Sequence, residues 1–180
     1  EGAPIGEVDL ETCRVPASAI SGGEPGLGSG TVMKTLNKQR DNHAALSVGP
    51  AIRMLDEALA YTKERQQFGR PIAEYQLIQA MLAECKVEIE AARALILETA
   101  RKRDRGDDVT LDVSMCKYYS TEMCGRVADK VVQVFGGQGY VKGRGIERFY
   151  RDVRATRIYE GTSQIHLLNI AKNMYKAMDG

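Results

Sequence analysis

The segment Ile78–Thr99, IQAMLAECKVEIEAARALILET, carries the clearest structural pattern in the chain. Its core-forming residues recur in steps of four and three, at Ile78, Leu82, Cys85, Ile89, Ala92, Ile96 and Thr99. This period places them on one face of an α-helix. A basic run from Arg101 to Arg105 and then Gly106 follow, as is typical of a helix C-terminus. The segment therefore predicts a long helix with one buried face.

Two neighbouring segments also have helical patterns. From about Gly30 to residues 64–67, a stripe is formed by Val48, Ile52, Leu55 and Leu59, and Pro50 within it predicts a kink. From residues 108–110 to Gly136, a second stripe is formed by Cys116, Met123, Val127, Val131 and Val134. Shorter helices are expected over 146–153 and 162–176. Long helices with short connections favour antiparallel neighbours, so residues 29–180 predict an all-α, up-and-down four-helix bundle.

Residues 1–28 have a different character. Glu7–Glu11 alternates polar and apolar residues, as a half-buried strand does, and Ser21–Gly28 is rich in turn-forming residues. A single strand cannot satisfy its own backbone groups. We therefore expect residues 1–28 to be the end of a β-domain with a linker, a short β remnant whose partner strands belong to a longer protein.

The composition excludes several classes of function. The net charge of +1 gives no field that would attract nucleic acid or an anionic membrane. No apolar run approaches the ~20 residues that a membrane span needs. The four cysteines form no C-x-x-C pair, and the two histidines have no partners at metal-ligand spacing. We expect no metal site and reduced thiols, as in a cytosol-like compartment.

One break between helical segments, Ile158–Ile165 (IYEGTSQI), places a carboxylate beside a glycine. Gly161 lets a ligand approach the backbone next to Glu160, and Thr162 can cap the following helix. This arrangement fits a general base at a ligand-binding turn. Taken alone, the motif is more typical of an ordinary helix start with a solvated glutamate.

Two further breaks contain glycines. Arg65 and Phe68 precede Gly69 and pair a fixed cation with an aromatic face, which suits a phosphate and a flat ring. They equally fit a surface arginine and a helix-end phenylalanine. The run Gly136–Gly139 (GGQG) does not follow a strand, so it is no dinucleotide fingerprint of the Rossmann type.

In this order and at this spacing, the breaks resemble the C-terminal part of FAD-dependent acyl-CoA dehydrogenases. Three motifs carry the resemblance: RQQFG at Arg65–Gly69, QVFGGQG at Gln133–Gly139, and YRD at Tyr150–Asp152 followed by IYEGTSQI. The resemblance runs from the last strand of the family's middle β-domain through its C-terminal helical domain. It implies α,β-dehydrogenation of an acyl-CoA to the trans-2-enoyl-CoA, with electrons passing to an electron-transferring flavoprotein.

The resemblance also implies roles for individual residues. Glu160 is the base that removes the α-proton, while the β-hydrogen leaves as hydride to FAD. Some family members carry the base on another helix, where this chain has Gln39, which cannot act as one. Contacts to FAD are implied for Arg65, Phe68, Gln76, Gln133, Gly137, Thr162 and Gln164. Contacts to the acyl-CoA are implied for Asn37, Arg40 and Gly161, although the family commonly has Asp in place of Asn37.

Because the implied FAD contacts come from two subunits, we expect a homotetramer built as a dimer of dimers. The chain on its own is expected to be inactive. The usual location of family members implies a bacterial cytoplasm or a mitochondrial matrix. Two alternatives are a bundle that serves only oligomerisation or interaction, and a superfamily cousin such as a flavin monooxygenase or nitroalkane oxidase. The intact Glu160 motif favours a dehydrogenase over both cousins.

Overall fold

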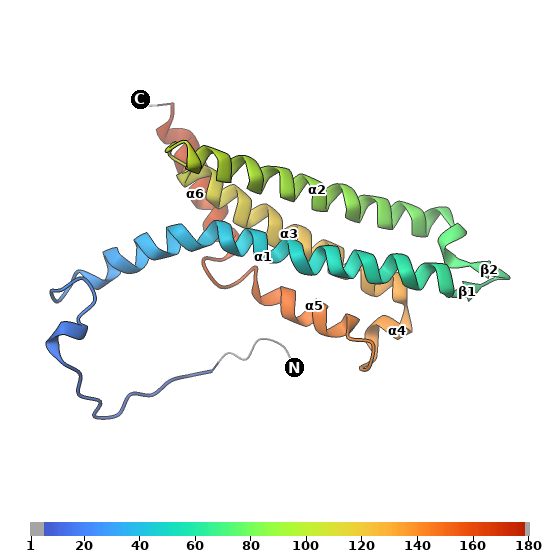
Figure 1. Cartoon of the computed structure of the whole chain (residues 1–180), viewed down its shortest axis with the longest axis horizontal. Coiled ribbons are helices and arrows are strands. Elements are labelled where there is room, and N and C mark those ends of the chain that lie inside the picture. The colour runs from blue at the N-terminus through green and yellow to red at the C-terminus, as the bar shows by residue number, and fades with distance from the viewer. Residues whose placement is uncertain (1–5, 179–180) are drawn as a thin grey trace.

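Three long helices form the body of the molecule, seen side by side in Figure 1. The computed structural model describes residues 6–178, without the side chains of Met33, Lys34 and residues 36–38. The long helices are α1 (Gly28–Glu64), α2 (Gln76–Asp104) and α3 (Thr110–Phe135). Each runs opposite to the one before it, as the short connections between them predict.

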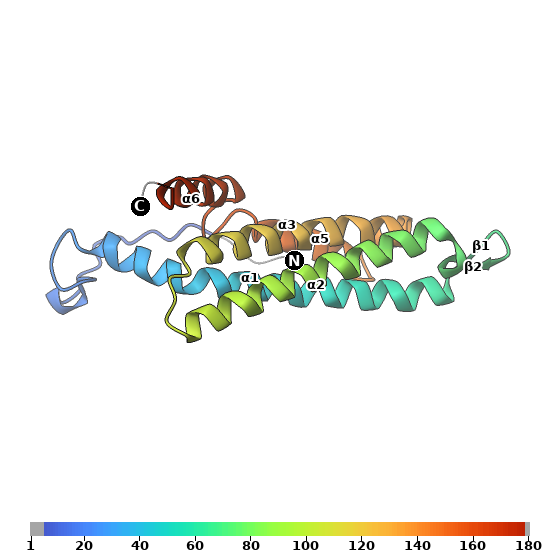
Figure 2. The same cartoon turned by 90° about the horizontal axis from the view of Figure 1, so that it is seen from above.

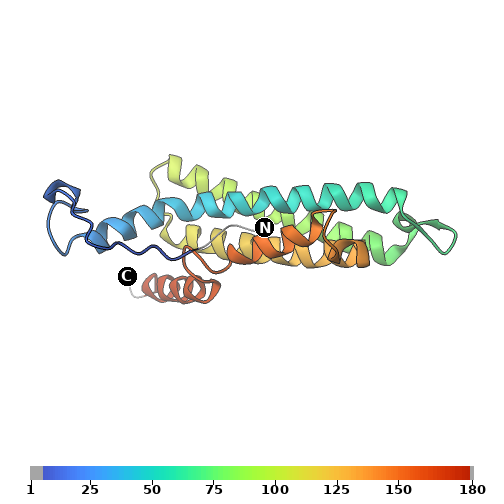
Figure 3. The same cartoon turned by 90° about the horizontal axis from the view of Figure 1, so that it is seen from below.

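The fourth side of the bundle is shared by shorter helices. After α4 (Gly137–Tyr140), α5 (Ile146–Ala155) and α6 (Ser163–Lys176) both pack against α3. Figures 1 and 3 show that they follow one another along it. Two short 3-10 helices, η1 (Ala17–Ala19) and η2 (Ile72–Glu74), are also present. The prediction of an all-α bundle is confirmed.

The core lies between the long helices. On α2 most of the predicted stripe is buried, with Cys85, Ile89 and Ala92 no more than 1% exposed, whereas Ile78 and Ile96 are partly buried. All five residues predicted for α3 are buried as well. No helix described between residues 6 and 178 is long and apolar enough to cross a membrane.

On α1 the predicted stripe is only half right. Val48 and Leu55 are buried, but Ile52 and Leu59 are 37% and 44% exposed. The residues buried in addition include Ala44, Ala51, Met54, Ala58 and Tyr61. Because α1 contacts α2, α3 and α5, its buried face is wider than one stripe, and small alanines let the neighbouring backbones approach. The helix continues through Pro50.

A tight hairpin joins α1 to α2. Strands β1 (Gln66–Gln67) and β2 (Arg70–Pro71) pair across Phe68 and Gly69, which both have positive φ, +53° and +84°. Positive φ at both central residues is typical of the two-residue hairpin turn whose twist matches the twist of the flanking strands. The Tyr75 hydroxyl donates to the Gln67 carbonyl over 2.9 Å and fixes the hairpin to the start of α2.

The strand predicted over Glu7–Glu11 is not formed. These residues are exposed and irregular, and no described segment offers them a partner strand. The alternating pattern is real, but a strand needs a neighbour for its backbone hydrogen bonds.

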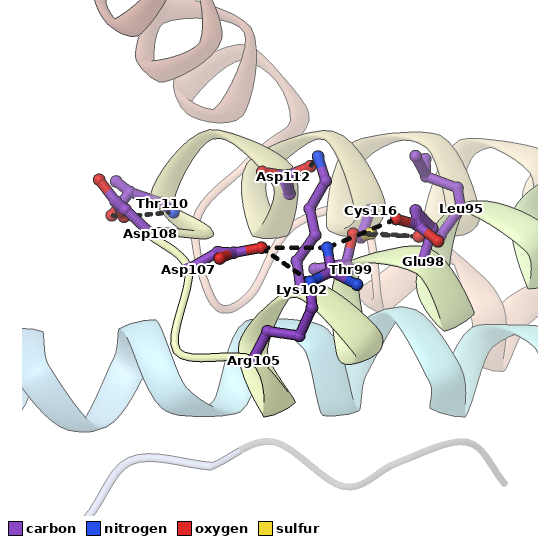
Figure 4. A network of polar contacts seen from close by, with 10 residues as sticks. All are labelled: Leu95, Glu98, Thr99, Lys102, Arg105, Asp107, Asp108, Thr110, Asp112 and Cys116. Carbon is purple, nitrogen blue, oxygen red and sulfur yellow. Dashed lines mark hydrogen bonds and ion pairs between the residues drawn. The ribbon is translucent and has the colours of Figure 1, made fainter.

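A polar network closes the turn between α2 and α3 (Figure 4). Lys102 Nζ lies 2.6 Å from Asp112 Oδ1, and Thr99 Oγ1 lies 3.1 Å from Cys116 Sγ. The Asp108 carboxylate accepts from the backbone N–H of Thr110, 2.9 Å away, and satisfies the first turn of α3. The turn therefore holds the two helices in register.

Replacement of Ile89 by alanine tests the core. Ile89 is 1% exposed between α2 and α3, so Ile89→Ala should lower the free energy of unfolding by about 2–5 kcal/mol. Val87→Ala, on the same helix but 68% exposed, is the control and should cost less than about 1 kcal/mol. Urea unfolding followed by circular dichroism measures both, and equal costs would contradict the described packing.

Candidate active site

The turn between α5 and α6 has an unusual backbone. Glu160 has a φ of +56° and Gly161 a φ of +90°. A non-glycine residue in the left-handed region costs on the order of 1–3 kcal/mol and persists only where its surroundings hold it. Glutamate has no special preference for this region, so the contacts around it must account for the conformation.

Two buried side chains hold the two carbonyl groups of this turn. Lys117 of α3 donates from Nζ to the Gly161 carbonyl over 2.6 Å. His166 of α6 approaches the Glu160 carbonyl, with Nε2 3.2 Å from the oxygen. Both side chains are 0% exposed. A Cβ at Gly161 would come within 3.1 Å of His166 Nε2, so a side chain there would press on this contact.

A third, partly buried side chain ties the two ends of the turn together. Glu122 of α3 accepts a hydrogen bond from the Ser163 hydroxyl over 2.5 Å and pairs with Arg157 over 2.5 Å. Burial opposes the charge of Glu122, but the hydrogen bonds from Arg157 and Ser163 outweigh it and lower the pKa of this carboxyl. The backbone N–H of Ser163 also donates to the Arg157 carbonyl. The residues that flank Glu160 are therefore fixed.

Helix α6 begins as the sequence predicts. The Thr162 hydroxyl accepts from the backbone N–H of Ile165 over 3.3 Å, as an N-cap does. This cap sets the direction in which α6 leaves the turn, and with it the position of His166.

The carboxylate of Glu160 is half-buried and incompletely satisfied. Its Oε2 atom is buried and has no hydrogen-bond partner among the described residues. An unsatisfied buried carboxylate oxygen is rare and calls for an explanation. Such an oxygen is a ready acceptor for a proton from a bound molecule.

Cationic groups lie close to this carboxylate. Burial lowers the pKa of Lys117 to about 8, the nearby Arg40 guanidinium adds to this, and Glu160 and Glu122 oppose it. Burial also lowers the pKa of His166 to about 4, so its imidazole is neutral at pH 7. A neutral ring with its proton on Nε2 donates to the Glu160 carbonyl.

A second group of predicted residues lies at the hairpin end of the bundle. A pocket of about 540 Å³ is lined there by Arg65, Phe68, Tyr75, Phe135 and Gly137, among others. Phe68 is 93% exposed, and the rings of Tyr61 and Phe135, which also line the pocket, stack with their centroids 4.1 Å apart. Gln76 begins α2 and Gln133 is exposed near the end of α3.

This pocket fits the FAD that the resemblance implies. An exposed aromatic face and apolar wall suit a flat ring, and the exposed Arg65 suits a pyrophosphate.

The described residues contain no group of three or more His, Cys, Asp or Glu side chains that could hold a metal ion.

The two groups of residues do not meet within one chain. Arg40 lies within α1 and Arg65 directly follows its last residue, 25 positions further on, which corresponds to about 37 Å along the helix. Thr162 and Gln164 lie with Glu160, whereas Arg65, Phe68, Gln76, Gln133 and Gly137 lie at the hairpin end (Figure 1). Arg40 is buried near Lys117, and the side chain of Asn37 lies outside the described residues.

Three residues that hold the turn were not anticipated from the sequence. Lys117 and Glu122 lie in α3, more than 35 positions before Glu160, and the sequence shows His166 only as a histidine without partners at metal-ligand spacing. One signal was available for Lys117. It directly follows Cys116 on the buried side of a helix, where a lysine is out of place.

The protein is similar to known enzymes over nearly its whole length. It is 42% identical to the 3-(aryl)acrylate reductase of Clostridium sporogenes over 97% of this chain and 46% of the relative. It is 39% identical to the caffeyl-CoA reductase-Etf complex subunit CarC of Acetobacterium woodii, again over 97% and 46%. The chain thus spans about half the length of the curated relatives it matches.

A solved structure shows the same fold. Butyryl-CoA dehydrogenase from Megasphaera elsdenii superposes with a TM-score of 0.80 and 37% identity, over 85% of this chain and 40% of that one. The family model described as acyl-CoA dehydrogenase, C-terminal domain, matches residues 26–175. The chain therefore belongs to the acyl-CoA dehydrogenase family and contains the family's C-terminal domain.

Proposed function

We propose that the protein removes hydrogen from the α- and β-carbons of an acyl-CoA thioester and releases the trans-2-enoyl-CoA. The observation that carries this proposal is the Glu160 carboxylate, which has a buried, unsatisfied oxygen and stands on a strained turn held from several sides. In a chain of this family, such a carboxylate fits the role of general base.

Glu160 takes the α-proton in this proposal. A carboxylate in water is far too weak a base for an unactivated carbon acid, so two conditions must assist it. Water has to be excluded when substrate binds, which makes the carboxylate more basic. The thioester carbonyl also has to be polarised, which makes the α-hydrogen more acidic. Gly161 leaves room for the thioester beside the base, and Asn37 and Arg40 of α1 hold the acyl-CoA.

Arg65, Phe68, Gln76, Gln133 and Gly137 hold FAD at the hairpin end, and Thr162 and Gln164 hold FAD beside Glu160. Bound FAD supplies the acceptor for the hydride that leaves the β-carbon. An electron-transferring flavoprotein then receives the electrons. The caffeyl-CoA reductase relative, which is named as a subunit of an Etf complex, supports this partner.

The separation of the two groups of residues supports a site shared between subunits. About 37 Å of helix lies between Arg40 and Arg65 in one chain. We infer that the hairpin end of one subunit meets the Glu160 end of another, within a homotetramer built as a dimer of dimers.

The reverse reaction is a second candidate. Two of the relatives are named as reductases. The same geometry serves both directions, because a base that takes the α-proton in one direction returns it in the other. Comparing rates with saturated and 2-unsaturated thioesters decides which direction the enzyme favours.

Replacement of Glu160 by glutamine tests the base. In the full-length protein, Glu160→Gln should lower kcat/KM for acyl-CoA oxidation by about 10²–10⁴-fold, because the amide cannot accept the proton. Loss of flavin absorbance after mixing with acyl-CoA thioesters of several chain lengths reports the reaction. Glu57→Gln, an exposed change on α1, is the control and should react like the unchanged enzyme. Normal turnover by Glu160→Gln would refute the assignment.

The 180-residue chain by itself provides another test. It should bind FAD poorly and show no dehydrogenation, because it covers less than half of its active relatives. An absorbance spectrum and an acyl-CoA assay measure both properties. A yellow, active preparation would show that these residues alone form the site.

A further inference from the structure

We propose that Lys117 is a positioning residue for Glu160, holding the turn that carries the carboxylate and placing a positive charge beside it. This inference rests on the proposed role of Glu160 as base. Lys117 contacts neither substrate nor cofactor in this proposal and acts only through the Glu160–Gly161 turn. The argument has three parts, which are burial, backbone geometry and charge.

The burial of Lys117 is costly. The side chain is 0% exposed, although lysine is among the residues that are almost never fully buried unless paired. The hydrogen bond described for its ammonium group goes to a backbone carbonyl, not to a carboxylate. A neutral donor could satisfy that carbonyl at lower desolvation cost. The charge therefore calls for a role beyond packing.

The hydrogen bond acts on the backbone of the base. The carbonyls of Glu160 and Gly161 both follow the Glu160 Cα, and they are held by His166 and Lys117 respectively. Fixing both carbonyls fixes the two peptide planes that follow Glu160, and so restrains the backbone on the C-terminal side of its strained conformation, whose φ is +56°. The direction of the carboxylate is thereby set by helices α3 and α6, which Figure 2 shows lying alongside each other.

The charge of Lys117 strengthens the hydrogen bond that holds the turn. The charged and titratable groups that face Lys117 are Arg40 of α1, Glu122 of α3, Glu160 of the turn and His166 of α6. Glu122 is already paired with Arg157, and His166 is neutral at pH 7. Lys117 and Arg40 are thus the cationic side chains among these groups, and the ammonium of Lys117 donates a charge-assisted hydrogen bond to the turn that carries Glu160.

The charge of Lys117 should depend on pH in the working range. Because burial lowers the pKa of Lys117 to about 8, the ammonium is intact at pH 7 and loses its proton as the pH rises through 8. Proton loss removes the cation and weakens the hydrogen bond, since charge-assisted bonds are roughly twice as strong as neutral ones. Activity should therefore fall on the alkaline side.

Replacement by methionine tests the proposal, since methionine keeps the length of lysine without charge or donor. In the full-length protein, Lys117→Met should lower kcat by about 10- to 100-fold, as expected for a misplaced base, with KM changed less than about threefold. The decline of kcat above pH 8 should disappear. In Lys117→Arg part of the rate should return, and the decline should move to much higher pH because arginine keeps its proton.

Two controls separate the explanations. Lys130→Met makes the same change on the same helix at a lysine paired with Glu84 and Glu88, and should leave kcat and its pH profile unchanged. An active Glu160→Gln variant would overturn both the role of Glu160 as base and the positioning role of Lys117. An inactive Glu160→Gln with an unchanged Lys117→Met would overturn the positioning role alone. If Lys117→Met does not fold, the comparison with Lys117→Arg decides. The proposal is overturned if kcat of the unchanged enzyme does not decline above pH 8. It is also overturned if the decline is the same in the unchanged enzyme and in Lys117→Arg.

Discussion

The length of α1 is the constraint on which the arrangement of the site depends. Helix α1 runs without a break at Pro50 from the acyl-CoA candidates in its N-terminal half to the hairpin at its other end (Figure 1). A helix of this kind cannot shorten, because each residue contributes a fixed rise of about 1.5 Å. Arg40 and Arg65 are thus kept apart in every copy of the chain. If both serve one site, that site needs two chains.

The second constraint is the turn that carries Glu160. Its strain is on the order of 1–3 kcal/mol. A hydrogen bond to a charged donor contributes about 1.5–3 kcal/mol and a neutral one about 1 kcal/mol. The hydrogen bonds from Lys117 and His166 therefore act against the strain, the burial of Lys117 reduces their net contribution, and the Glu122–Arg157–Ser163 group adds to them. The turn therefore holds the Glu160 carboxylate in a defined position.

Helix positions could be predicted from the sequence because each follows from local periodicity. The α2 stripe was largely right because this helix buries one face, and the five residues predicted for α3 are buried, although α3 packs against several helices and also buries residues outside that stripe, such as Val113 and Lys117. The stripe of α1 was half wrong, because its contacts with several helices decide which residues are buried, and those contacts are not local. The hairpin at Phe68–Gly69 was missed because its strands have only two residues each.

The site was predictable only as far as motifs reach. Glu160, Arg65 and Phe68 stand in recognisable stretches, but Lys117 and Glu122 act on a turn about 40 positions further along the chain. No local pattern connects them to it. Their role becomes visible only when α3 and the α5–α6 turn are placed side by side.

The most direct test of a site shared between two chains is subunit mixing. Glu160→Gln and Arg65→Ala are made in separate copies of the full-length protein, and each should have little activity. When both are co-expressed, random pairing makes half of the dimers mixed, and each mixed dimer has one of two sites intact. The account predicts recovery of about a quarter of the unmodified activity. No recovery above the two separate variants, in oligomers shown to contain both chains, would contradict it.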